Sequence, residues 1–383
     1  MNATMARVLL VLEPPDGGVA ENVMQLALGL GERGFAVEVA GPREAIIYSR
    51  LREAGVPVHP VPFTPGFSHP LKDAVSSVEL ARLVGRGRFD LVHAHSAKAG
   101  VVGRIAALAR RLPVVYSPHC FPFVGPWGWP RRTFALTVER GLGRWTDRIV
   151  CVAADEERLA VEERVAPADR LTMVHNGCAA PPDGLEPDER LERLRAAGPL
   201  AACLAVLRPQ KSVHVFLEAA PRILSAMPEA RLAVIGDGTQ KAELEARARE
   251  LGIADRVPFI SFRPPAFRQL ASLDVFVLPS AWEAFPISVL EALASGVPQV
   301  ATDVGGTREA LLDGRTGLLC PPGDPAALAE RIGALLGDPA RRQSMSESSR
   351  QRWEQNFTLD AMLDATAVVY EDVLAGRARA KSS

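Results

Sequence analysis

The sequence lacks several patterns that would assign it to common classes of protein. Its 383 residues include only five cysteines, an odd number with no C-x-x-C pair, so we expect a reducing compartment and no disulfide framework. No apolar run reaches the ~18 residues of a membrane-spanning helix, and the N-terminus shows no secretory leader pattern. We therefore expect a cytoplasmic protein whose contact with a membrane, if it has one, is peripheral.

Other absences narrow the function. The formal net charge of −1 gives no reason to expect nucleic acid as a partner. The first strand is followed by Asp16-Gly17-Gly18 and not by G-x-G-x-x-G, which disfavours an NAD-dependent oxidoreductase. No D-x-D, the usual sign of a metal-bridged diphosphate, occurs in the chain. We expect neither a bound metal nor a cofactor.

The chain is too long for one ordinary hydrophobic core, and two domains are the natural expectation. Apolar strand patterns alternate with amphipathic helix patterns in both halves, which is typical of α/β folds with parallel sheets. A stretch rich in proline and glycine at residues 179–187 is the best linker candidate. The sequence therefore predicts two Rossmann-like doubly wound domains, at residues 1–178 and 179–357.

A strand, a loop and a helix in the second half carry two carboxylates. Residues 275–278 form the apolar run of a buried parallel strand, Pro286 stands where proline begins helices, and Gly296 where glycine ends them. At ~1.5 Å per residue, Glu291 lies ~7.5 Å along the helix from a phosphate held by its first turn. This fits a diphosphate with an attached ribose, beside Glu283 in the loop. Two solvated glutamates are the alternative that the spacing alone leaves open.

Two cations stand in an earlier loop of the second half. Arg208 and Lys211 follow a strand predicted at residues 200–207 and precede a helix that opens at Val213. Fixed positive charge and the free N–H groups of a helix start both attract anions. A solvated loop charge is the alternative for Lys211.

Two glycine turns follow predicted strands. Gly236 and Gly238 end a strand of the second half, and Gly17 and Gly18 follow the first strand of the chain. Glycine allows the backbone to approach a ligand closely. A tight turn at the end of a parallel strand is the alternative in both places.

Three histidines gather at predicted strand ends of the first half, which is where open α/β sheets place their ligands. His93 and His95 lie on one strand, and His119 lies in the loop after the next strand. Backbone hydrogen bonds at a strand end are an equal explanation for His93 and His95. His119 is the candidate for a functional role.

These motifs resemble those of one enzyme family. Glu283 and Glu291, with seven residues between them, resemble the E-x7-E motif of retaining GT-B glycosyltransferases of family 4, also called glycosyltransferase group 1. The run His-Ala-His-Ser-Ala-Lys-Ala-Gly at residues 93–100, with His119, resembles the acceptor-domain motifs of its bacterial polysaccharide-type members. The resemblance implies two domains that face each other across a cleft. It also implies a C-terminal helix, at about residues 358–383, that crosses back to complete the first domain.

The resemblance also implies residue roles. Lys211 and an arginine would neutralise the leaving diphosphate, Glu283 would face the sugar, Glu291 would bind the ribose, and His119 would lie near the transferred sugar. We expect catalytic roles for Glu283, His119, Lys211 and Arg208, and donor binding by Gly17, Gly18, Gly236, Gly238, Phe262, Arg263, Phe285, Pro286, Ile287 and Glu291.

The chain departs from the family pattern at two positions. Many members carry the arginine five positions before the lysine, where this chain has Val206, and Arg208 is the candidate replacement. Many have glycine after the histidine, where this chain has Cys120.

The expected activity is transfer of a hexose or N-acetylhexosamine from a nucleotide sugar, with UDP as the expected nucleotide, and with retention of anomeric configuration. The acceptor would be a glycan, a lipid-linked molecule or a small natural product. A non-catalytic nucleotide-sugar-binding partner of another transferase is the alternative function.

The aromatic and proline-rich stretch at residues 121–132 offers a peripheral membrane contact. It runs from Phe121 through Trp127 and Trp129 to Arg131 and Arg132, and aromatic and basic side chains together suit a membrane surface. A loop packed over the cleft is the alternative.

Overall fold

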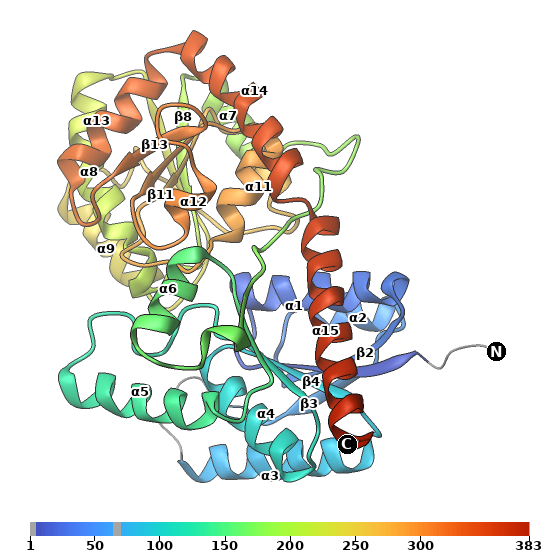
Figure 1. Cartoon of the computed structure of the whole chain (residues 1–383). Coiled ribbons are helices and arrows are strands. Elements are labelled where there is room, and N and C mark those ends of the chain that lie inside the picture. Colours follow the sequence, from blue (N-terminus) through green and yellow to red (C-terminus); the bar gives the residue numbers. More distant parts are fainter. Residues whose placement is uncertain (1–4, 64–69, 383) are drawn as a thin grey trace. The chain divides into compact units, whose positions relative to one another are not determined.

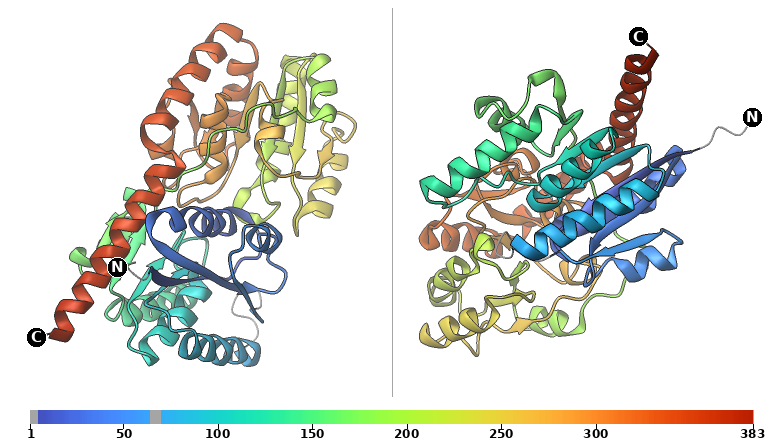
Figure 2. Two further views of the ribbon diagram at one scale, coloured as in Figure 1. Left: turned by 90° about the vertical axis from the view of Figure 1, so that its right-hand side faces the viewer. Right: turned by 90° about the horizontal axis from the view of Figure 1, so that it is seen from below.

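The structure, a computed structural model, describes residues 5–63 and 70–382 (Figure 1). It divides the chain into two compact units, Met1–Asn176 with Leu359–Ser383, and Gly177–Thr358. Each unit is built on one parallel sheet with helices packed against it (Figures 1 and 2). The predicted α/β fold with two Rossmann-like domains is confirmed.

The first unit contains a seven-stranded parallel sheet in the order β3-β2-β1-β4-β5-β6-β7. Side chains of β1 alternate between two cores, with Val8 and Leu10 on one face of the sheet and Leu9 and Val11 on the other. Both faces are therefore covered, as in doubly wound folds. The strands are β1 (Ala6–Leu12), β2 (Phe35–Pro42), β3 (Val58–Val61), β4 (Leu91–His95), β5 (Val114–Ser117), β6 (Arg148–Cys151) and β7 (Leu171–Met173).

Helices connect these strands and form both outer layers. They are α1 (Gly17–Gly29), the 3₁₀ turn η1 (Leu30–Arg33), α2 (Tyr48–Glu53), α3 (Pro70–Arg86), α4 (Ala97–Ala109), α5 (Trp129–Gly143), α6 (Ala154–Glu162), the 3₁₀ turn η2 (Ala168–Arg170) and α15 (Leu359–Ser382).

Helix α15 is the last element of the chain, yet it belongs to the first unit, as predicted. Its apolar face packs into the core beside β1 and β2, where Tyr370 meets the ring of Phe35 edge-on at 5.3 Å between centroids. Arg33 donates to Asp360 and Asp364, each at 2.7 Å. The helix runs alongside this sheet in Figures 1 and 2.

The second unit contains a six-stranded parallel sheet in the order β10-β9-β8-β11-β12-β13. Its strands are β8 (Leu200–Leu204), β9 (Arg231–Ile235), β10 (Phe259–Ile260), β11 (Val275–Leu278), β12 (Gln299–Thr302) and β13 (Gly317–Cys320). Its helices are α7 (Glu189–Ala196), the 3₁₀ turn η3 (Pro209–Lys211), α8 (Val213–Ala226), α9 (Lys241–Glu250), α10 (Phe267–Leu270), α11 (Ile287–Ser295), α12 (Thr307–Ala310), α13 (Pro325–Leu336) and α14 (Pro339–Asn356).

Three predicted elements differ from the structure. The sequence pattern predicts a helix at residues 133–145, but helix α5 begins at Trp129, because Pro130 occupies the first turn, where its missing N–H costs nothing. Helix α1 begins at Gly17, so Gly17 and Gly18 form its first turn and do not precede it. The sequence pattern at residues 257–263 predicts a strand, but only the two residues of β10 are paired there, with the end of β9 at one edge of the sheet.

Candidate active site

The second unit reverses its strand order between β8 and β11, the place where open parallel sheets bind ligands beyond the strand ends. The two strands pair in parallel, with Cys203 opposite Val277, so their carboxyl ends lie at the same edge. The loop after β8 contains η3 and the loop after β11 leads to α11. Lys211 and Glu283, predicted separately from the sequence, lie on these two loops.

Lys211 and Glu283 are in direct contact. The Lys211 Nζ lies 2.5 Å from Oε1 of Glu283, and the Ser280 hydroxyl donates to the same oxygen at 2.6 Å. Glu283 is 9 % exposed, so its carboxylate is held largely out of water. A backbone hydrogen bond joins the same two loops, since the Ala281 N–H donates to the carbonyl of Gln210 at 2.8 Å. The geometry fixes a cation and a carboxylate side by side at the switch point.

A pair of glycines supports this loop; the sequence indicates a glycine loop before a helix there, but the pair was not among the predicted site residues. Gly305 has a φ of +46°, and a Cβ there would lie 1.9 Å from the carbonyl oxygen of Glu283. The next residue, Gly306, donates its N–H to the carbonyl of Ala284 at 2.8 Å. The Glu283 backbone is therefore seated against a position that only glycine can occupy.

The glycines at the end of β9 also permit close backbone contact. Gly236 has a φ of +146°, and a Cβ there would lie 1.9 Å from the Ala205 carbonyl oxygen; at Gly238, with a φ of +158°, it would lie 2.4 Å from that of Leu207. Leu207 in turn donates its N–H to the carbonyl of Asp237 at 2.9 Å. These glycines hold the β8 loop and the β9 loop together, and this packing explains why glycine stands there.

Phe262 and Arg263 follow β10 at the same edge and are both exposed. Their main-chain N–H groups donate to Asp237 at 3.3 Å and to Gln269 at 3.2 Å. Arg208 is half-buried and begins η3, three positions before Lys211. The structure thus brings the predicted donor-binding positions of this unit to one edge of its sheet.

The helix start predicted at Pro286 is present, but the side chains around it differ in role. Pro286 is the N-cap of α11, and Gly296 ends the helix with a φ of +67°. Phe285 and Ile287 point into the core, with Phe285 against the ring of Phe357 at 5.4 Å between centroids. The two residues can meet a donor only through their main chains. Glu291 is half-buried, one and a half turns along the helix.

In the first unit the order reverses between β1 and β4. Gly17 and Gly18 open α1 beyond β1, while His95 ends β4 and His119 follows β5. These residues belong to the first unit, whereas the other predicted site residues belong to the second.

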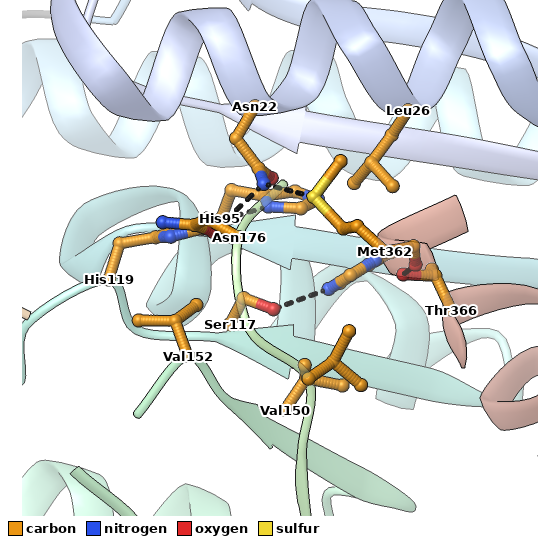
Figure 3. Close-up of a pocket in the computed structure, with 12 residues that line it drawn as sticks. Asn22, Leu26, His95, Ser117, His119, Val150, Val152, Asn176, Met362 and Thr366 are labelled. Carbon is orange, nitrogen blue, oxygen red and sulfur yellow. Dashed lines mark hydrogen bonds between the residues drawn. The ribbon is translucent and has the colours of Figure 1, made fainter. Parts of the chain in front are cut away.

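The three histidines lie together as an array, with His93 and His95 buried and His119 half-buried; Figure 3 shows His95 beside His119. Nδ1 of His95 lies 3.0 Å from Nε2 of His119, and the rings of His93 and His95 lie 3.9 Å apart between centroids. His93 is bonded at both ring nitrogens, to the Tyr370 hydroxyl at 2.6 Å and to the Ser117 hydroxyl at 2.9 Å. The predicted alternative for His93 and His95, backbone hydrogen bonds, is wrong, because their ring partners are side chains.

Burial keeps these histidines uncharged. It holds the pKa of His93 and His95 well below the ordinary range and lowers the pKa of His119 to about 4. A cavity of about 10 Å³ adjoins the array, with Asn22, Asn176 and Met362 among its walls (Figure 3).

The backbone around the array is strained. Ser96, His119 and Cys120 have positive φ values of +75°, +49° and +92°, although none is glycine. Strain of this kind persists where the surroundings impose it and is concentrated at functional sites. One of these residues, Cys120, is held by Glu156, whose two carboxylate oxygens accept the N–H groups of Cys120 and Val152, each at 2.8 Å.

The stretch at residues 121–132 is buried in part. Phe121 and Phe123 are buried and stack at 5.0 Å between centroids. Trp129, at the start of α5, is 77 % exposed, and Phe134 on the helix and Trp145 just after it are 69 % and 63 % exposed. Within residues 5–63 and 70–382, no helix is long and apolar enough to cross a membrane, and no three His, Cys, Asp or Glu side chains are grouped to hold a metal ion.

Comparison with known proteins adds family information to this geometry. The family model described as "Glycosyl transferases group 1" matches residues 189–352, and the model described as "Glycosyl transferase 4-like domain" matches residues 17–177. The first match lies within the second unit, and the second match covers the first unit from residue 17 and ends one residue beyond Asn176.

Individual proteins match along most of the chain. The D-inositol 3-phosphate glycosyltransferase of Nocardia farcinica is 32 % identical over 86 % of this chain and 79 % of the relative. The UDP-Gal:alpha-D-GlcNAc-diphosphoundecaprenol alpha-1,3-galactosyltransferase of Escherichia coli is 25 % identical over 80 % and 81 %. The crystal structure of Anabaena HepE in complex with UDP-glucose superposes with a TM-score of 0.81 at 21 % identity, over 96 % of this chain and 99 % of that one. This structural likeness shows a shared fold.

Proposed function

The chain belongs to the group 1 glycosyltransferases, and we propose that it transfers a hexose or N-acetylhexosamine from a UDP-linked sugar to an acceptor hydroxyl, with retention of anomeric configuration and without a bound metal. The observation that carries this proposal is the contact between Lys211 and Glu283 at the switch point of the second sheet. A cation for the leaving group and a carboxylate for the sugar are what this transfer needs in one place.

The leaving diphosphate requires stabilisation of its charge as the glycosidic bond breaks, and preorganised donors supply this without reorganisation. Lys211 provides a fixed ammonium, and Arg208 provides a second cation on the same loop. The free N–H groups at the start of α11 add a third source of positive potential. Metal independence is supported by these groups together with the absence of D-x-D in the sequence.

Three side chains would bind the sugar and the ribose. Glu283 orients sugar hydroxyls and stabilises positive charge at the anomeric carbon, while Glu291 accepts hydrogen bonds from the ribose. His119 lies near the transferred sugar. A uridine nucleotide is supported by the UDP-glucose complex of the HepE structure.

The acceptor we propose is a glycan, a lipid-linked molecule or a small natural product. The two relatives support different members of this group, since one is named for D-inositol 3-phosphate and the other for a diphosphoundecaprenol-linked GlcNAc.

The test is substitution at the contact. We expect Lys211→Ala and Glu283→Gln each to remove most transfer while the fold is kept, whereas Arg193→Ala and Glu189→Gln, which break an exposed ion pair of the same unit, leave it unchanged. Radiolabelled transfer to a panel of acceptors measures activity, and the anomeric configuration of the product is read by NMR. Near-normal turnover in both site variants would contradict the proposed role of Lys211 and Glu283.

The alternative function, a non-catalytic nucleotide-sugar-binding partner, makes a different prediction for the isolated protein. A catalyst slowly hydrolyses its donor when no acceptor is present, because water can replace the acceptor hydroxyl. Hydrolysis of UDP-sugar that disappears in Glu283→Gln supports catalysis. Donor binding with no hydrolysis and no transfer supports the alternative.

We further propose that the protein works at an anionic lipid surface through the outer face of α5. The inner face of this helix is anchored by Glu139, which accepts from Arg104 at 2.9 Å and from the Tyr116 hydroxyl at 3.1 Å. Phe134 lies on this helix and Trp145 lies two residues after its end, and both side chains are exposed.

Charge on the same helix favours a lipid partner. Four arginines, Arg131, Arg132, Arg140 and Arg144, are exposed between and beside the aromatic side chains. Glu163 neutralises part of this charge through contacts to Arg132 and Arg140. Exposed aromatic residues with arginines around them suit the boundary between acyl chains and anionic headgroups.

Vesicle sedimentation tests this proposal. We expect binding to vesicles that contain phosphatidylglycerol, little binding to pure phosphatidylcholine, and loss of binding in Phe134→Ser/Trp145→Ser. The matched control is Val161→Ser, which changes an exposed apolar residue on α6 of the same unit. Equal sedimentation of the double variant and the control would contradict the proposal and would leave a protein partner as the explanation of the aromatic face.

A further inference from the structure

One hydrogen bond joins His95 and His119, with 3.0 Å between Nδ1 of His95 and Nε2 of His119. Both rings are neutral at pH 7, because burial lowers the pKa of each. One nitrogen of the pair must therefore donate and the other accept. Which ring donates determines whether Nδ1 of His119 carries a proton or a lone pair.

The surroundings of His95 decide between the two arrangements. Its remaining nitrogen, Nε2, is buried and has no hydrogen-bond partner among the residues that the structure describes. If His119 donated to His95, the proton of His95 would lie on Nε2 as a buried N–H without an acceptor, the rarer and costlier case. If His95 donates, Nε2 carries a lone pair instead. The adjoining cavity of about 10 Å³ is at the lower limit for a single water.

We infer that His95 is a positioning residue that fixes His119 in the tautomer protonated at Nδ1. His119 then accepts at Nε2 and presents Nδ1–H, which is bonded to none of the described residues, as a hydrogen-bond donor. This inference rests on the proposed function for its meaning, since a fixed N–H donor suits a hydroxyl oxygen of a sugar. His119 acts in this arrangement as an orienting donor and not as a general base.

Contacts also hold the backbone at His119 and the ring of His95 in place. Glu156 accepts the N–H of Cys120 at 2.8 Å and so holds the left-handed conformation of the residues on which His119 stands. His93 closes the array from the other side, because its ring lies against that of His95 and is itself bonded to Tyr370 and Ser117. Neither the ring of His95 nor the backbone of His119 can turn without breaking these contacts.

Nitrogen NMR of the full-length protein tests the tautomer directly and needs no substrate. With ¹⁵N-labelled histidine at neutral pH, we expect both His95 and His119 to carry their proton on Nδ1, the opposite of the form that free histidine favours. The signals are assigned by comparison with His95→Asn and His119→Asn. A proton on Nε2 of His119 overturns the inference, whatever the activity of the protein, and a proton on Nδ1 supports it even where the proposed transfer fails.

A pair of substitutions tests the positioning role in catalysis. The amide of asparagine falls where Nδ1 stood and keeps a donor for His119, while the amide of glutamine falls where Nε2 stood. We expect His95→Asn to retain kcat within ~3-fold and His95→Gln to lower kcat by ~10-fold or more, with little change in KM for the nucleotide sugar. A role in packing alone predicts the reverse order, because glutamine fills more of the space. That reverse order, or equal kcat in both variants, contradicts the inference.

Discussion

Glu283 is a carboxylate in a nearly closed site, and the structure places two donors on one of its oxygens. Lys211 and Ser280 both bind Oε1, at 2.5 Å and 2.6 Å. The second oxygen, Oε2, has no hydrogen-bond partner among the described residues and is not fully buried, since it is absent from the unsatisfied buried atoms. One oxygen is therefore fixed by the protein and the other remains open to a ligand.

The first prediction concerns the glycine on which Glu283 is seated. If the loop that carries Glu283 has the proposed role, we expect Gly305→Ala to lower kcat by ~100-fold or more, because a Cβ 1.9 Å from the Glu283 carbonyl oxygen must displace that loop. Circular dichroism and steady-state kinetics of the purified variant measure the effect. The control is Gly314→Ala, where φ is also positive, at +77°, but nothing lies within 4 Å of the new Cβ.

The control should cost only the left-handed backbone strain, ~1–2 kcal/mol of stability, and should leave kcat unchanged. Equal kinetics in Gly305→Ala and Gly314→Ala would show that the contact with Glu283 does not position the loop.

The difference between predicted and observed site residues has a physical cause. Lys211 and Glu283 could be named from the sequence because each stands beside a strand end and a helix start, which are local patterns. Ser280 and Gly305 could not, because their roles depend on contacts with Glu283 that only folding creates. Phe285 looks like a ligand-facing aromatic in the sequence, whereas packing against Phe357 turns it inward.

At the scale of elements, three neutral histidines lie near the carboxyl ends of strands β4 and β5, two of them on β4 and one in the loop after β5. His93 and His95 are fully enclosed and His119 is bonded to His95. The groups bonded to their rings are the Tyr370 and Ser117 hydroxyls at His93 and the ring of His119 at His95. None of these neighbours offers a negative charge that would favour protonation of His93 or His95.

The second prediction is that the first unit is labile in acid. The pKa of each histidine is lowered in the folded state, so below ~6.5 the unfolded chain binds protons that the folded chain does not. Stability is therefore fully present above this pH, and each neutral histidine removes ~1.4 kcal/mol of it for every pH unit below. For His119 the loss ends near a pH of about 4, where the folded state also binds its proton.

Urea unfolding at a series of pH values between 7 and 5 measures this slope. We expect His93→Gln, which keeps an amide near Ser117, to be less stable than the natural chain at pH 7 but to lose stability less steeply as the pH falls. The control is His214→Gln, at an exposed position on α8. A slope for His93→Gln identical to that of the natural chain would refute the assignment of the acid lability to the buried array.

Element boundaries were predictable where one local signal dominated and not where two competed. Strand β11 coincides with the predicted residues 275–278, because this uninterrupted apolar run is typical of a strand that is buried on both faces. Helix α5 was predicted to start four residues too late, because Gly125, Pro126, Gly128 and Pro130 together indicate a loop, although Pro130 is compatible with a first helical turn. β10 is short because it pairs with only one neighbour and ends near two prolines.

At the scale of the whole molecule, the chain closes its first unit with its last helix. The family resemblance predicted this return, whereas composition and periodicity did not, because an amphipathic helix does not reveal which core it joins. The partners lie far apart in sequence, as in the contact of Arg33 with Asp364 and the double contact of Arg377 with Asp147. The first core therefore includes side chains from the last helix.

The third prediction is that removal of residues 359–383 unfolds the first unit and spares the second. The deletion strips the first core of the buried side chains of Met362, Leu363, Ala367, Val369, Tyr370 and Val373. At ~1.5–3 kcal/mol for each large apolar side chain, the loss reaches ~10 kcal/mol, comparable with the whole stability of an ordinary domain. It also leaves His93 without the Tyr370 hydroxyl.

Hydrogen exchange followed by mass spectrometry separates the two units peptide by peptide. We expect fast exchange in β1, β2 and β4 of the shortened chain and slow exchange in β8 and β11, together with retained binding of UDP to the second unit. A chain cut after Arg377 is the control, because it keeps those buried side chains and the contact with Asp147. Protected β1 and β2 in the longer deletion would mean that the first sheet holds its core without α15, and fast exchange in both units would mean that the second unit depends on the first for its stability.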